Sequence, residues 1–126
     1  MKYLGIDYGT KRVGIAISDD AGEFAFPKDI VATQDAIKHV TSLCESEKVQ
    51  AVVIGESIAN NGIPNEVAPL ISKFKAEVAM ATSLPVFLER EDYSSVEAHR
   101  YQEKKGARDD SAAAVILQRF LDKREK

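Results

Sequence analysis

The sequence has few of the residues that bind zinc or form cross-links. It contains one cysteine, Cys44, and two histidines, His39 and His99, far apart along the chain. A single cysteine excludes an internal disulfide, and no cluster of cysteine and histidine has the spacing of a zinc site. Cys44 lies among apolar residues at helical spacing, which is typical of a buried core thiol.

Long apolar runs and an excess of positive charge are also missing. No stretch approaches the roughly 20 apolar residues of a membrane-spanning helix, and the N-terminal residues lack the layout of a signal peptide. We therefore expect a cytoplasmic protein without a membrane partner. The formal net charge of −3 argues against a protein that coats nucleic acid by charge alone, so any nucleic-acid contact must be local.

The sequence does contain regularly spaced short apolar segments. A length of 126 residues with 44% hydrophobic content suits one domain spanning residues 1–126. Three tightly connected segments near the N-terminus predict an antiparallel meander, and later segments alternate between helical periodicity and short continuous runs. The predicted strands cover 2–7, 13–18, 23–31, 50–55 and 85–88, and the predicted helices cover 33–48, 65–83 and 94–105, with a last helix from 109 or 110.

Several residues mark the ends of these elements. Thr33 has a side chain suited to the N-cap of the first helix, and Asp109 or Asp110 opens the last one. Residues 56–64 have the composition of a loop. Pro69 lies inside the first turns of the second helix, where it either shifts the start or introduces a kink.

The order of elements is three strands, helix, strand, helix, strand and two helices. A meander followed by right-handed crossovers gives a mixed five-stranded sheet with helices on both faces. This is the layout of the ribonuclease H-like fold, an α/β fold, which we therefore expect for this chain.

Acidic residues stand at the ends of four predicted elements. Asp7 ends the first strand, Glu56 follows the buried run AVVIG, Glu91 follows the fifth strand and Asp109 opens the last helix. Each acid alone is more typical of a surface or capping residue. Carboxylates held close together repel unless cations neutralise them, and Mg²⁺ or Mn²⁺ accepts such ligands together with a substrate phosphate. The recurrence of acids therefore predicts a metal site that supports phosphodiester cleavage.

A polar turn follows the acid of the first strand. Thr10, Lys11 and Arg12 stand beside the predicted metal site, where they can hold a scissile phosphate, although composition alone favours an ordinary solvated turn. Tyr8 can stack on an unpaired base or pack within the fold. Asn61 either orients a nucleic-acid strand or forms a simple Asn-Gly turn.

Four segments resemble a known family. They are the opening GIDYGTKRVGIAISD, the run VVIG followed by NNG, the segment PVFLEREDYSSVEA and the closing DDSAAAVILQRFLD. They are similar to the YqgF family of pre-16S ribosomal RNA nucleases, also described as Holliday-junction-resolvase-like proteins, over essentially the whole chain. The resemblance implies a ribonuclease H-like fold, a divalent metal, and hydrolysis of structured nucleic acid at the 5′ end of pre-16S rRNA during ribosome biogenesis.

Carried over by position, the family's first acid matches Asp7 and its last acid matches Asp109. After the fifth strand the family usually has Asp-Glu-Arg, whereas residues 90–92 here are Arg-Glu-Asp. The central Glu91 matches, and its two neighbours have exchanged charge.

A second departure lies after the fourth strand. The family usually has Gly-Leu-Pro there, whereas residues 55–57 here are Gly-Glu-Ser. Either Glu56 has taken over as a metal ligand with Glu91 in a secondary role, or the site has drifted and catalysis is weakened.

Two other classes of function fit parts of the sequence. A strand, an acid and Gly-Thr also open sugar kinases, actin and related ATPases, but those proteins close two such domains over ATP and 126 residues supply one. A binding module that recognises RNA, branched DNA or a protein without cutting is the other alternative. The oligomeric state stays open, since Holliday-junction cleavage requires a homodimer with two sites and trimming of an rRNA end needs only a monomer.

Overall fold

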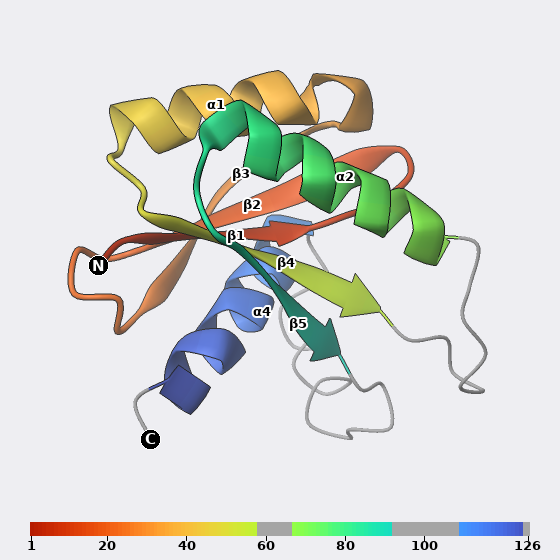
Figure 1. Cartoon of the computed structure of the whole chain (residues 1–126). Coiled ribbons are helices and arrows are strands. Elements are labelled where there is room, and N and C mark those ends of the chain that lie inside the picture. Colours follow the sequence, from red (N-terminus) through yellow and green to blue (C-terminus); the bar gives the residue numbers. More distant parts are fainter. Residues whose placement is uncertain (58–66, 92–108, 125–126) are drawn as a thin grey trace.

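The computed structural model describes residues 1–57, 67–91 and 109–124. Within these ranges the chain forms a five-stranded sheet with helices α1 (Ala36–Ser46) and α2 (Val67–Thr82) on one face and helix α4 (Asp109–Arg124) on the other (Figure 1). The predicted helix over 94–105 and the candidate residue Asn61 lie outside the described residues. No helix within these ranges has the length and apolarity of a membrane span.

The sheet is mixed, as predicted. Strands β1 (Tyr3–Asp7), β2 (Arg12–Ser18) and β3 (Ala25–Ala32) form the antiparallel meander. Strands β4 (Ala51–Ser57) and β5 (Val86–Glu91) add in parallel on the other side of β1. The strand order is β3-β2-β1-β4-β5, so the first strand is central.

Strands β4 and β5 continue beyond the apolar runs that predict them. β4 ends at Ser57 and β5 at Glu91, and the two remain paired to their ends. The parallel ladder uses backbone groups alone, so polar side chains do not stop it. The prediction that residues 56–64 are all loop was therefore wrong at Glu56, which lies within β4.

The first helix differs from its prediction at the start. A 3₁₀ turn, η1 (Thr33–Asp35), precedes α1, and neither receives a side-chain capping bond. The Thr33 hydroxyl donates instead to the carbonyl of Gly9 at 2.7 Å. The prediction of Thr33 as N-cap was wrong because Thr33 is the first residue of η1, whereas the N-cap position of α1 is Asp35.

The second helix tolerates its proline. α2 is described from Val67, and the predicted first residues 65 and 66 lie outside the described residues; Pro69 is the third residue of the described helix. A first-turn residue has no acceptor for its amide within the helix, and the missing N–H of proline therefore costs little there. The helix runs on to Thr82.

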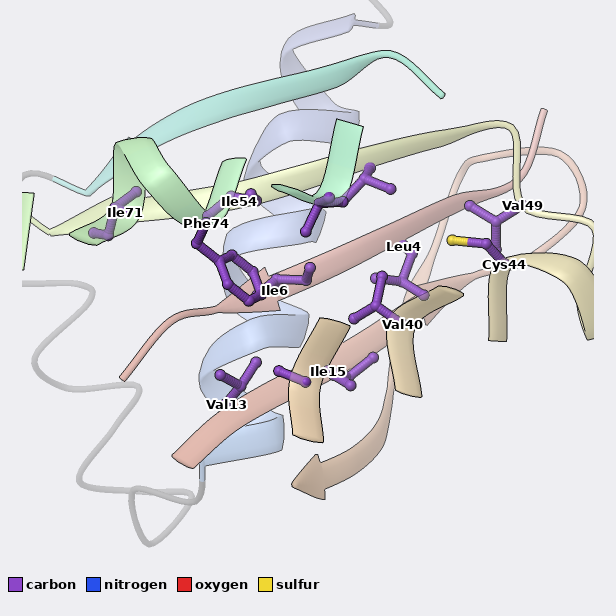
Figure 2. Close-up of a cluster of buried hydrophobic side chains, with 13 residues drawn as sticks. Leu4, Ile6, Val13, Ile15, Val40, Cys44, Val49, Ile54, Ile71 and Phe74 are labelled. Atoms are coloured by element: carbon purple, nitrogen blue, oxygen red, sulfur yellow. The ribbon is translucent and has the colours of Figure 1, made fainter. Parts of the chain in front are cut away.

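Alternate residues of the central strands supply two hydrophobic cores, one on each face of the sheet. β4 is covered on both faces, and its first four residues are fully buried, as the continuous run AVVI predicts. Figure 2 shows the core between the sheet and helices α1 and α2, which includes the buried Cys44. The core under α4 consists of Tyr3, Ala16, Ala51, Val53, Ala113, Ile116, Leu117 and Leu121.

Two glycines let α4 lie close to the sheet. A Cβ on Gly5 would lie 2.7 Å from Cβ of Leu117, and a Cβ on Gly55 would collide with Cδ1 of Ile116. Such approaches are below any ordinary contact distance between carbon atoms. The absence of side chains at these two positions therefore sets the distance between α4 and the central strands β1 and β4.

Candidate active site at the carboxyl end of the central strand

Asp7 is the last residue of β1 and is half-buried. Its neighbours in the sheet are Gly14 of β2 and Gly55 of β4, so neither adjacent strand contributes a side chain beside it at the same register. Residues two apart in a strand share a face, and Asp7 therefore belongs with Tyr3 and Gly5 on the face that α4 covers.

The start of α4 lies toward Asp7. Tyr3 contacts Phe120 with ring centroids 5.8 Å apart, whereas Gly5, two residues along the strand, faces Leu117 and the carbonyl of Ala113. Residues nearer the end of β1 thus contact residues nearer the start of α4. The helix therefore crosses the strand in the opposite direction (Figure 1). One further step of two residues on β1 reaches Asp7, while one further helical turn leads back from Ala113 toward Asp109.

The other two predicted acids lie on neighbouring strands. In the parallel ladder, Asp7 pairs with Gly55, and Gly55 pairs with Glu89 of β5. Glu56 is one residue beyond that level on β4, and Glu91 is two residues beyond it on β5. For Glu56, Glu91 and Asp109 the placement is that of the backbone. The structure thus brings the four predicted positions to the same end of the sheet.

Among the residues whose side chains are described, no three acidic, histidine or cysteine side chains lie close enough to hold a metal ion. Asp7 belongs to that described set, and the other three predicted ligands do not. The metal site therefore stays a prediction at this stage.

The turn between β1 and β2 carries the predicted phosphate contacts. Thr10, Lys11 and Arg12 are all exposed, and Arg12 is the first residue of β2. Gly9 approaches so closely that a Cβ there would collide with the carbonyl oxygen of Arg12. The turn is therefore tight, and it presents polar side chains next to the strand end that holds Asp7.

Tyr8 packs within the fold. Its ring lies 4.9 Å from the ring of Phe74 in α2, at an interplanar angle of 53°, and it is half-buried against the core under α1 and α2. Of the two interpretations of Tyr8, the structure supports packing.

Two polar residues with structural roles escaped prediction from the sequence. Glu89 is buried at 4% exposure and accepts a 2.6 Å hydrogen bond from Nζ of Lys123, which ties the end of α4 to β5. Thr33 bonds to the turn after β1. Neither role has a local signal, because Glu89 stands in a charged run and Thr33 before a helical pattern, and both partners are remote in sequence.

A mixed five-stranded sheet, an acid at the end of its central strand and a final helix packed across that strand define a ribonuclease H-like protein. Solved structures agree on the fold. RuvC of Thermus thermophilus has a TM-score of 0.64 at 17% identity, with 99% of this chain and 96% of that chain covered. The Holliday-junction resolvase of fowlpox virus has a TM-score of 0.50 at 15% identity, with 83% and 72% covered.

The chain belongs to the RuvX family, whose model is described as Holliday junction resolvase and matches residues 1–123. Curated relatives carry the name "Putative pre-16S rRNA nuclease". The protein of Oleidesulfovibrio alaskensis is 38% identical over 97% of this chain and 92% of its own length. That of Hydrogenovibrio crunogenus is 33% identical over 94% and 92%. The YqgF resemblance is confirmed, and this is a nuclease-family protein on a ribonuclease H-like fold.

Proposed function

We propose that this protein is a metal-dependent nuclease that hydrolyses phosphodiester bonds in structured nucleic acid at the end of β1. The observation that carries the proposal is the direction of α4, which crosses β1 so that the start of the helix, with Asp109, lies toward the end of the strand that holds Asp7. Two acids far apart in the sequence are thereby directed to one place, where Mg²⁺ or Mn²⁺ offsets their repulsion.

The proposed ligands are Asp7, Asp109 and Glu91. They suit Mg²⁺ or Mn²⁺ in kind because all are carboxylates, and Gly14 and Gly55 contribute no side chain beside Asp7. When bound, the ion supplies water activation and charge neutralisation for phosphodiester hydrolysis.

The two-residue period of a strand favours Glu91 over Glu56 as a ligand. Position 91 has the same parity as Glu89, which bonds to α4, and so belongs to the face of Asp7. Position 56 has the parity of Ile54, which belongs to the core under α1 and α2. Glu56 is therefore proposed as a secondary residue.

The chain's own cations hold the substrate. Lys11 and Arg12 stand in the exposed turn directly after Asp7, where their charges bind a phosphate and Thr10 adds a hydroxyl. The net charge of −3 makes such a local contact necessary for binding a polyanion.

The proposed substrate is the 5′ end of pre-16S rRNA, after the name that the curated relatives carry. Branched DNA is the alternative, since a solved RuvC structure has a Holliday junction bound. A monomer suffices for rRNA trimming, whereas junction cleavage requires a homodimer. We place the protein in the cytoplasm, where ribosomal precursors are processed.

The test replaces the central acid. Asp7→Asn removes a metal ligand with almost no change in volume, so cleavage of a pre-16S rRNA fragment or a four-way junction in Mn²⁺ should fall by about 100-fold or more. The fold should be retained, because loss of one charge relieves repulsion in the metal-free protein. Cleavage rates and thermal midpoints of both proteins check this.

Asp35→Asn is the matched control. Asp35 is an exposed aspartate in η1, and its replacement changes the net charge equally without touching the site. Full cleavage by Asp7→Asn, or an equal loss in Asp35→Asn, would refute the assignment.

A second candidate function is nucleic-acid binding without cleavage. The exchanged charges in residues 90–92 favour it, because they alter the surroundings of one proposed ligand. In that case wild-type protein binds the RNA or the junction, Mn²⁺ produces no cleavage of either, and Asp7→Asn binds as well as wild type.

A further inference from the structure

Thr33 is bonded twice to the turn between β1 and β2. Its hydroxyl donates to the carbonyl oxygen of Gly9 at 2.7 Å, and its backbone amide donates to the carbonyl oxygen of Lys11 at 3.0 Å. Both bonds cross from the segment after β3 to a turn more than 20 residues earlier in the sequence. The two acceptors lie on either side of Thr10, so Thr33 holds the middle of the turn.

Thr33 is the first residue of η1, and its hydroxyl does not cap the helix that follows. The N-cap positions of η1 and α1 are Ala32 and Asp35, and neither has a side-chain capping bond. The hydroxyl is directed away from the helix and onto the turn. The side chain of Thr33 therefore serves the turn between β1 and β2 and not the helix.

Other contacts already restrict the backbone of this turn, and the bonds from Thr33 restrict it further. Gly9 already lies against the carbonyl of Arg12 so closely that no side chain fits. The ladder fixes the start of β2, where Arg12 pairs with Ala32, the residue before Thr33. With the carbonyls of Gly9 and Lys11 also held, the backbone that carries Lys11 is fixed on both sides.

We propose that Thr33 is a positioning residue for phosphate binding, acting through Lys11 and Arg12. This role rests on the proposed nuclease function. A turn already fixed in its binding conformation pays less ordering entropy when the phosphate arrives. Thr33 thus contributes to substrate affinity without contacting substrate, and the chemical step depends on it little.

The test removes the hydroxyl and keeps the shape. Thr33→Val retains the backbone bond to Lys11 and loses the bond to Gly9. We expect KM for the nucleic acid to rise about 3- to 10-fold, as for loss of one hydrogen bond, with kcat within about twofold of wild type. The slope of log affinity against log salt should fall by up to about one, because a phosphate contact of Lys11 or Arg12 is weakened.

Two further variants separate positioning from general stability. Thr33→Ser keeps the hydroxyl and should restore KM and the salt slope. Thr41→Val is the matched control, because the Thr41 hydroxyl also donates a 2.7 Å bond to a backbone carbonyl, that of Ile37 within α1. It should leave both values unchanged. If Thr33→Val does not fold, Thr33→Ala is measured in its place.

A double-mutant cycle checks the route of the effect. In a Lys11→Ala, Arg12→Ala background, Thr33→Val should raise KM no further, because the groups it positions are gone. An undiminished effect in that background, a wild-type KM and salt slope in Thr33→Val, or an equal rise in Thr41→Val would each overturn the proposal.

Failure of the proposed function and failure of the proposed role of Thr33 give different results. If the wild-type chain neither binds nor cuts the RNA or the junction, the proposed function fails and the role of Thr33 fails with it. If the wild type cuts and Thr33→Val matches it, only the positioning role is lost.

Discussion

At the scale of single residues, glycines leave the space around Asp7 free of neighbouring side chains from their own positions. Gly14 and Gly55 flank it in the sheet, and Gly9 permits the tight turn that follows. A side chain at any of these positions would occupy space beside the acid or move the backbone next to it. The small residues of GIDYGTKRVG therefore shape the site as much as its charged residues do.

Cys44 gives a prediction at this scale. Burial raises the pKa of its thiol to about 11, whereas an exposed thiol has a pKa of about 8.5. At pH 7.5 the folded protein should therefore react with iodoacetamide about 300-fold more slowly than the urea-unfolded chain, because only the thiolate reacts. Mass spectrometry of the single thiol measures both rates.

The raised pKa of the Cys44 thiol also determines the direction in which folding stability changes with pH. Between about pH 8.5 and 11 the thiol is ionised in the unfolded chain and protonated in the folded one, so the folded state binds more protons. Stability therefore falls as pH rises through this window. Cys44→Ala should lack this part of the alkaline loss in urea titrations, and equal reaction rates in folded and unfolded protein would contradict the assignment.

Residue roles divide into those that local sequence reveals and those that it does not. Burial of Cys44 follows from helical periodicity, which reflects the residue's own element. Thr33 and Glu89 instead depend on Gly9 and Lys123, partners brought close only by the finished fold. Their local sequence favoured a helix cap and a solvated charge, and tertiary contacts overrode both.

At the scale of elements, the packing of α4 against the sheet determines where Asp109 lies. Gly5 and Gly55 allow the close approach, and the buried Glu89 bonds Lys123 near the helix end. Phe120 contacts both Tyr3 and Phe87, with ring centroids 5.8 and 5.4 Å away. The helix is therefore fixed along its length by contacts with β1, β4 and β5.

Replacement of one of these glycines should displace the helix. A Cβ in Gly55→Ala collides with Cδ1 of Ile116 and lies 3.0 Å from its Cγ1, so we expect a loss of about 1–3 kcal/mol in unfolding free energy. Cleavage should fall too, since α4 carries Asp109. Urea denaturation and cleavage rates measure the two effects.

A second replacement supplies the control. Ile116→Val removes Cδ1 and should restore part of the stability of Gly55→Ala. It should not rescue Gly5→Ala, whose Cβ meets the backbone carbonyl of Ala113 at 3.2 Å and Cβ of Leu117. Equal rescue of both variants would show that the collision with Ile116 is not the cause.

Element type was predictable from the sequence, and element ends less so. Apolar periodicity gave every described strand and helix its type, because burial sets that pattern. The strands β4 and β5 extend to Ser57 and Glu91, where backbone pairing continues without apolar side chains. Glu56 is thus part of a strand, where its position assigns it to one face of the sheet. A loop prediction assigns no face, although the face bears on the role of Glu56.

At the scale of the whole molecule, the predicted site joins the first strand, the fifth and the last helix. The sequence predicted the mixed five-stranded sheet and the family, since the meander and the crossovers restrict topology strongly. It predicted acids at the ends of elements but not which of them share a face. That depends on register, which pairs Asp7 with Gly55 and Ser57 with Glu91.

Metal binding should stabilise the whole fold. An ion that binds only the folded state adds about 2.7 kcal/mol at 100 times its Kd, so Mn²⁺ should raise the thermal midpoint of the wild type. Glu91→Gln should reduce this shift strongly and Glu56→Gln should not, in agreement with strand parity. Differential scanning fluorimetry with and without EDTA measures it, and the reverse ranking would make Glu56 the ligand.

The covering of one sheet face by α4 also has a consequence for synthesis. Tyr3, Ala51 and Val53 are buried under a helix that is synthesised after all five strands. A nascent chain therefore carries an uncovered apolar surface until residues 109–124 have emerged, and such surfaces favour aggregation. The final folding step must wait until α4 has been synthesised, and a chain terminated before that helix exposes side chains that the folded protein hides.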